Sequence, residues 1–181
     1  MEDKTTRPGV SIRLLERTGF GALVDLFARN HEGIGGTAGG EAFDRAAQLA
    51  RLERKLTERA EGRGESWTIH VDDALAGDIG FNQLHRGKAQ SANVGYMVDA
   101  GLRGRGVATT ALGLVIRESF EHLHLHRLDA SALVTNRASQ RVLEKAGFRR
   151  VGVVERHFYE DGAWRDHVWY ELIGPDLPPH P

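Results

Sequence analysis

The feature that most constrains this chain is a glycine-rich turn placed between a strand-like segment and a helix-like segment. Three glycines fall within six residues in Gly101-Leu102-Arg103-Gly104-Arg105-Gly106, and glycine adopts backbone conformations that other residues avoid. Residues 92–98, which come before the turn, read as a strand. The residues after it repeat apolar side chains at a spacing close to 3.6, namely Leu112, Val115, Ile116, Phe120 and Leu123. The pattern predicts a strand, a tight turn and an amphipathic helix in succession.

This junction favours the binding of an anion. The start of a helix presents backbone N–H groups that lack intrahelical acceptors, and the helix dipole adds partial positive charge there. Arg103 and Arg105 add full positive charges beside the turn. We therefore predict a phosphate or pyrophosphate site at the turn and the first helical residues. The alternative is a tight strand-to-helix connection with solvated arginines.

Two common phosphate-binding motifs do not match the turn. It lacks the Gly-Lys-Ser/Thr ending of a P-loop, which argues against a metal-bound nucleoside triphosphate. Thr109 stands near the place where a dinucleotide fingerprint has its third glycine, and the turn lies past the middle of the chain. A nicotinamide cofactor is therefore disfavoured.

Further motifs follow the turn in a fixed order. The turn contains Arg103-x-x-Gly106-x-Ala108. Downstream come Asn136-x-x-Ser139 and Leu143-Glu144-Lys145-Ala146-Gly147-Phe148. The chain then closes with Gly162-Ala163-Trp164-Arg165-Asp166 and a strand at residues 168–172. Together these motifs resemble the RimJ/RimL-type branch of the GNAT N-acetyltransferases, over roughly residues 10–173.

The resemblance implies an α/β fold in which a central mixed, mostly antiparallel sheet is splayed after its fourth strand and flanked by helices. Periodicity along the chain agrees with such a mixture. We expect strands at residues 10–15, 67–71, 76–84, 92–98, 128–134, 149–155 and 168–172, and helices at residues 20–29, 41–60 and 138–146, with a flexible glycine-rich segment at residues 31–40.

Composition supports one intracellular domain. The chain has 181 residues, and we assign residues 1–174 to a single domain. The proline-rich tail, residues 175–181, is expected to be frayed. A net charge of −1 argues against nucleic acid or a membrane surface as a partner.

Other classes of protein and site are also disfavoured. The chain has no cysteine, no apolar run long enough to cross a bilayer and no signal-peptide core, so we expect a cytoplasmic protein. The spacing of His122, His124 and His126 puts successive rings on opposite sides of a helix, and we predict no metal site.

The resemblance also implies a co-substrate, acetyl-CoA, and a set of residues that bind it. Backbone groups of Met97 and Val98 would pair with the pantetheine arm, one N–H polarising the thioester carbonyl. The pyrophosphate would lie on the turn and the helix start, Arg103, Gly104, Arg105, Gly106, Val107, Ala108 and Thr109. Asn136 would contact the pantetheine amide, with capping of a helix or turn as the alternative. Arg141 and Lys145 would reach the phosphoadenosine end, unless either is an ordinary solvated charge.

The resemblance places Ser139 near the coenzyme sulfur, where it would protonate the leaving thiolate. The alternative is a serine that satisfies N–H groups at a helix start. Many relatives carry a glutamate on the strand before the turn, but this chain has Asn93 there, which cannot accept a proton. We take Glu160 as the candidate general base, and ordered water, Tyr159, Asp161, His85 and His157 stay open as further candidates.

We expect direct acetyl transfer to a primary amine, most simply a protein N-terminal α-amine. Such an amine has a pKa of about 8 and is partly neutral at cytoplasmic pH, whereas a lysine at about 10.4 needs more help. Ribosomal proteins are typical acceptors in the resembled branch. A small-molecule amine is the rival acceptor, and a non-catalytic coenzyme-binding module is the rival class. Residues 31–40, the helix at 43–60 and a loop at 158–164 would select the acceptor, and a homodimer is left open.

Overall fold

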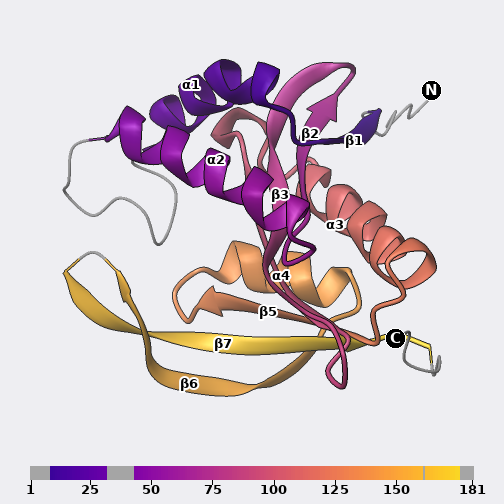
Figure 1. The fold of residues 1–181 in the computed structure, drawn as a ribbon. Coiled ribbons are helices and arrows are strands. Elements are labelled where there is room, and N and C mark those ends of the chain that lie inside the picture. The colour runs from indigo at the N-terminus through magenta and orange to yellow at the C-terminus, as the bar shows by residue number, and fades with distance from the viewer. Residues whose placement is uncertain (1–8, 32–42, 161, 176–181) are drawn as a thin grey trace, which may run out of the picture.

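The structure is a computed structural model that describes residues 9–31, 43–160 and 162–175. Figure 1 shows a central sheet with helices on both sides. In chain order the elements are β1 (Val10–Leu14), η1 (Arg17–Gly19), α1 (Phe20–Asn30), α2 (Arg45–Ala60), β2 (Ser66–Val71), β3 (Ala74–His85), β4 (Ser91–Val98), η3 (Ala100–Leu102), α3 (Val107–Arg117), η4 (Glu118–His122), β5 (Arg127–Leu133), α4 (Arg137–Lys145), β6 (Arg149–Glu160) and β7 (Ala163–Ile173).

The described strands form one seven-stranded sheet in the order β1-β2-β3-β4-β5-β7-β6. Neighbouring strands run antiparallel, with the exception of β4 and β5, which run parallel. The mixed, mostly antiparallel sheet expected from the sequence is confirmed. The parallel pair is joined through α3, as a parallel connection requires.

Two hydrophobic cores lie on opposite faces of the sheet. Alternation along β5 sends Leu128, Ala130 and Ala132 into the larger core, which also contains the buried face of α3. The smaller core lies under α1 and α2 and includes Met97 at its margin. Alternate residues of β4 therefore serve different faces: Met97 points toward α1 and α2, whereas Tyr96 packs with the α3 and α4 side.

The helix α2 is rich in charged residues because most of its surface is exposed. Of its residues Leu52 alone is buried, and the rest of the helix faces outward or packs at its margin. The predicted start at residue 41 lies outside the described residues. Within them the helix begins at Arg45, because the side chain of Asp44 caps it by accepting from the N–H of Ala47 at 3.0 Å. The glycine-rich segment after His31 and the tail after Pro175 also lie outside the described residues.

The end of the chain differs from the expected loop at residues 158–164. The strand β6 continues to Glu160 and β7 begins at Ala163, so most of this stretch belongs to a hairpin. Glu160 pairs with Ala163, and Gly162, which directly precedes Ala163, has a φ of 73°. Asp-Gly between Phe158-Tyr159 and Trp164, which are residue types that favour strands, is a strong hairpin signal, and the expectation of a loop overlooked it.

Two kinds of feature are missing from the part of the chain that the structure describes. No helix there is both long enough and apolar enough to span a bilayer. Nor do three histidine or acidic side chains gather there in a way that could hold a metal ion.

Candidate active site

The site begins at the place where β4 and β5 separate. They pair only from Ser91–Arg127 to Asn93–Asp129, at the start of each strand. Beyond Asn93, β4 keeps its partner β3 but has no register partner on β5. The sheet therefore opens on one side of β4 over the residues that the sequence analysis assigned to pantetheine binding.

Backbone direction along β4 determines which groups face this opening. The N–H of Asp99 donates to the carbonyl of Ala76 on the β3 side at 2.8 Å. Because the direction alternates along a strand, Met97 also directs its backbone groups to β3, whereas Tyr96 and Val98 direct theirs to the opening. The backbone groups of Val98 therefore face the opening, as its predicted role requires, whereas those of Met97 belong to the β3–β4 ladder.

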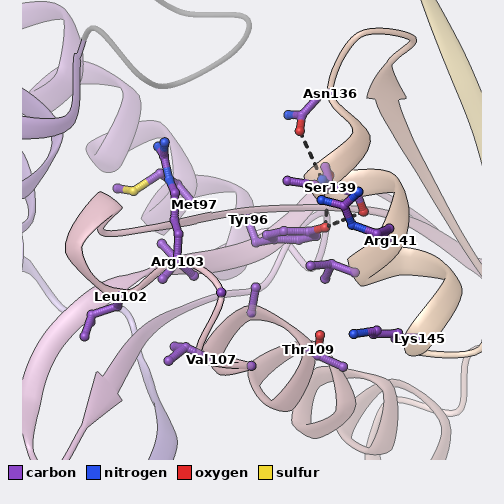
Figure 2. Close-up of a pocket in the computed structure, with 16 residues that line it drawn as sticks. Tyr96, Met97, Leu102, Arg103, Val107, Thr109, Asn136, Ser139, Arg141 and Lys145 are labelled. Carbon is purple, nitrogen blue, oxygen red and sulfur yellow. Dashed lines mark hydrogen bonds between the residues drawn. The ribbon is translucent and has the colours of Figure 1, made fainter.

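A pocket of about 350 Å³ occupies the opening. It collects residues from β4, the glycine turn, α3 and α4 (Figure 2). Its lining consists of Tyr96, Met97, Val98, Leu102, Arg103, Gly104, Gly106, Val107, Ala108, Thr109, Asn136, Ala138, Ser139, Arg141, Val142 and Lys145. All the residues predicted to bind the coenzyme are in this set except Arg105, which the structure does not place in the lining.

The glycine turn owes its shape to backbone conformation. Gly104 has a φ of 76° and Gly106 a φ of 80°, both in the left-handed region that side chains with a Cβ rarely adopt. An added Cβ at either position would meet nothing within 4 Å, so space within the protein does not explain the glycines. Gly106 is also the residue that precedes α3, and the turn therefore sets the direction in which the helix starts.

The residues before the turn are held by α1. The side chain of Asn30, at the end of α1, accepts from the N–H of Ala100 at 2.7 Å, and Arg29 donates to Asp99 at 2.7 Å and 2.9 Å. Asp99 in turn accepts from the N–H of Gly101 at 3.1 Å. Burial acts to raise the pKa of Asp99, but these hydrogen bonds together hold it below its ordinary value. The turn is therefore attached to the body of the protein on one side.

The electrostatics of the pocket favour an anion. Val107, Ala108 and Thr109 are the first residues of α3, whose N–H groups have no intrahelical acceptor. Arg103, Arg141 and Lys145 add positive side chains, and the described lining residues include no carboxylate. A helix start with three cations around it fits a pyrophosphate and further phosphate groups.

The N-terminus of α4 supplies the hydroxyl group. Asn136 caps this helix by accepting from the N–H of Ser139 at 3.0 Å, which is the capping role considered from the sequence. The carboxamide oxygen is therefore engaged, and the Nδ2 group is the part of Asn136 suited to a pantetheine carbonyl. The Ser139 hydroxyl lies 3.0 Å from the hydroxyl of Tyr96 (Figure 2). Burial raises the pKa of Tyr96 to about 12, an effect that the hydrogen bond with Ser139 partly offsets.

Glu160, the predicted general base, is not among the residues that line the pocket. It lies at the end of β6, where its Oε2 is 3.6 Å from Nε2 of the buried His167. His157 and Trp169 complete an aromatic group with His167. Burial, and after it the nearby His167, lowers the pKa of His157. The structure thus gathers titratable groups at this hairpin but does not join them to the pocket.

The remaining residues considered for the base are scattered over the fold. Asn93 accepts a hydrogen bond from the side chain of Asn82 at 3.3 Å, so this position carries a neutral pair. His85 is opposite Ser91, at the end of β4 remote from the pocket. Tyr159 packs against Trp164 at 5.7 Å between ring centroids, and Asp161 lies outside the described residues.

Comparison with known proteins now identifies the family. The model of the acetyltransferase (GNAT) domain matches residues 10–149. The chain belongs to the GNAT acetyltransferase family. The RimJ/RimL-type resemblance is also confirmed, because named members of that branch are among the relatives and the structure neighbours.

Among the relatives, a probable N-acetyltransferase YjcK from Bacillus subtilis is 39% identical over 105 residues, which are 58% of each protein. The [ribosomal protein uS5]-alanine N-acetyltransferase of Escherichia coli is 31% identical over 105 residues, 58% of this chain and 54% of that enzyme. These matches span little more than half the length of either relative. Among solved structures, Mycobacterium smegmatis RimJ in complex with CoA-disulfide aligns with a TM-score of 0.83 and 25% identity, over 91% of this chain and 81% of that one.

Sequence reasoning missed Tyr96 and the apolar walls Leu102, Ala138 and Val142. A signal for Tyr96 was present. Ala92 and Val94 are buried on one face of β4, and alternation puts Tyr96 on the same face as α4. The apolar walls gave no comparable signal, since a small or aliphatic residue beside a motif reads as ordinary core.

Proposed function

We propose that this chain is a cytoplasmic N-acetyltransferase that moves the acetyl group of acetyl-CoA directly to a primary amine. One observation carries the proposal. The opening between β4 and β5 joins an anion site, an unpaired strand edge and the Ser139 hydroxyl in one pocket. Residues 1–174 act as a single catalytic domain in this proposal.

The pocket has a fitting group for each part of the coenzyme. The start of α3, with Arg103, suits the pyrophosphate. Arg141 and Lys145 on α4 suit the further phosphate of the adenosine end. The open edge at Val98 suits the amide-bearing pantetheine arm, which would extend along it as an added strand does.

Ser139 is the proposed proton donor for the departing thiolate. Its side chain lines the pocket, and the helix cap at Asn136 fixes its backbone. A positioned acid of this kind contributes a factor of about 100 to 10,000 to a rate. Glu160 is the proposed base, acting through ordered water because it does not line the coenzyme pocket.

We propose a protein N-terminal α-amine as the acceptor, with ribosomal proteins as the first class to examine. Support comes from the relatives named for acetylation of ribosomal proteins, among them the uS5-alanine enzyme. The neutral Asn93–Asn82 pair also favours an amine that needs little help with deprotonation, as an α-amine does. A small-molecule amine is the rival acceptor.

The test has two stages. Titration calorimetry with acetyl-CoA, and with ATP and NAD as controls, should show micromolar binding of acetyl-CoA alone. Thiol release is then measured with peptides bearing free N-termini, with the same peptides acetylated, and with polyamines and amino acids. Turnover that requires a free peptide N-terminus supports the proposal. Turnover with polyamines alone would mean that the acceptor is a small-molecule amine and not a protein N-terminus. Tight binding without turnover on any amine would point to a coenzyme-binding module instead.

A further inference from the structure

The phenol of Tyr96 reaches from β4 to the start of α4 beside the opening in the sheet. Its backbone belongs to β4 beyond the last β4–β5 pair, and its ring reaches α4 on the other side (Figure 2). Its hydroxyl lies 3.0 Å from Oγ of Ser139 and 3.4 Å from the backbone carbonyl of the same residue. Both residues line the pocket, so this contact is part of the wall that the coenzyme would touch.

The direction of the hydrogen bond matters for the chemistry. Each hydroxyl group has one hydrogen, and Tyr96 can place its own on Oγ or on the carbonyl of Ser139. The contact with Oγ is the shorter one, and a phenol is a stronger acid than an alcohol, so donation from Tyr96 to Ser139 is the better bond. The hydrogen of Ser139 is then directed away from Tyr96 and is available to a group in the pocket.

The protonation state of Tyr96 supports the same arrangement. Burial holds its pKa at about 12, so the phenol keeps its hydrogen at any pH at which the protein would work. A hydroxyl that never ionises can serve as a permanent donor. The residue is therefore suited to orient its neighbour and unsuited to act as a base.

We propose that Tyr96 is a positioning residue for Ser139: by donating to Oγ it directs the serine hydrogen at the leaving sulfur. The inference rests on the proposed function. In the step, the amine nitrogen bonds to the acetyl carbon and the carbon–sulfur bond breaks with its electron pair on sulfur. Sulfur takes the hydrogen of Ser139, and the proton that the amine loses through solvent restores the hydrogen of Ser139, while Tyr96 keeps its own hydrogen throughout.

The test removes the hydroxyl of Tyr96 without removing the ring. Tyr96→Phe should lower kcat about tenfold, the usual value of one hydrogen bond, and leave the KM for acetyl-CoA within about twofold. Tyr170→Phe is the matched control, because Tyr170 is a buried tyrosine whose hydroxyl bonds Glu144 at 3.1 Å outside the pocket. It should leave kcat unchanged.

A double variant separates positioning from a merely structural role. If Tyr96 acts through Ser139, then Tyr96→Phe combined with Ser139→Ala should be no slower than Ser139→Ala alone. The inference would be overturned if the losses in kcat of the two single variants multiplied in the double variant. It would also be overturned if Tyr96→Phe left kcat unchanged or changed only KM. The proposed function would stay intact in each of these cases. Absence of turnover in the unsubstituted chain with every amine would remove the proposed function, and this inference with it.

Discussion

The two sides of the opened sheet are built in different ways. On the coenzyme side, the pocket draws on two stretches of chain, residues 96–109 and 136–145, which contain the glycine turn and the starts of α3 and α4. On the other side, the candidate groups come from isolated positions such as Asn93 on β4 and Glu160 on β6. A site made of backbone and helix ends is encoded by a short motif, whereas a site made of single side chains depends on the whole fold.

The difference also separates what is common to a family from what can vary. Acetyl-CoA is the co-substrate common to the family, and its pyrophosphate suits the kind of anion site that a glycine turn and a helix start provide. The acceptor is expected to differ between enzymes, and we expect side chains on α2 and on the β6–β7 hairpin to select it. On that side this chain carries Asn93, paired with Asn82, where the family resemblance led us to expect an acid.

The largest expected effect tests whether the coenzyme side contains the chemistry. Ser139→Ala should lower kcat by at least about 100-fold, because the leaving thiolate loses its proton donor. The affinity for acetyl-CoA, measured by calorimetry, should stay within about twofold. Ser11→Ala on the distant strand β1 is the control. A Ser139→Ala variant with full turnover at saturating substrates would show that the serine only serves the helix.

The next effect should be confined to the acceptor side. Glu160→Gln should lower kcat/KM for the amine about tenfold, since a water-mediated base is lost while the α-amine is still partly neutral. Binding of acetyl-CoA should not change, because Glu160 does not line the pocket. Weaker coenzyme binding in this variant would mean that the two sides are coupled.

A pair of neighbouring arginines tests the geometry of the turn. Arg103→Ala should weaken acetyl-CoA binding about fivefold, as expected for one exposed charge-assisted contact to phosphate. Arg105→Ala should change it less than twofold, because Arg105 is not in the lining. Equal losses in the two variants would indicate a diffuse electrostatic attraction rather than a contact, and raising the salt concentration would then abolish both effects.

The smallest effect concerns stability. Gly106→Ala should destabilise the fold by about 1 kcal/mol, because a residue with a Cβ resists a φ of 80°. Gly113 lies inside α3 with nothing within 4 Å of an added Cβ, so Gly113→Ala should stabilise the fold by about 0.5 kcal/mol. Urea denaturation of the two variants measures both changes. If the two substitutions changed the free energy of unfolding in the same direction, the conformational explanation for Gly106 would be wrong.

Sequence patterns predicted most of the residues that line the pocket, because those residues belong to short local motifs. The turn, the start of α3 and the cap of α4 are each formed by residues that lie close together in the sequence. Arg105 shows the limit of such reasoning. It is as close to the glycines as Arg103, yet Arg103 lines the pocket and Arg105 does not, and the local sequence gives no sign of the difference.

Contacts between residues far apart in the chain could not be predicted from the sequence. Tyr96 and Ser139 are 43 positions apart, and their hydroxyl groups meet because the fold brings the end of β4 beside the first turn of α4. The pairing of Glu160 with His167 depends in the same way on the register of β6 and β7. That register shifts between Arg150 and Gly152 and between Val154 and Phe158, and the periodicity of the sequence does not predict these shifts.

The gap between β4 and β5 has a consequence for the free protein. An unpaired strand edge inside a sheet leaves its amide hydrogens open to exchange with water, and Tyr96 and Val98 would be the residues concerned. A ligand that lies along this edge should slow their exchange and join the two halves of the sheet into one cooperative unit. Hydrogen exchange at these two amides, with and without acetyl-CoA, would therefore follow the completion of the sheet residue by residue.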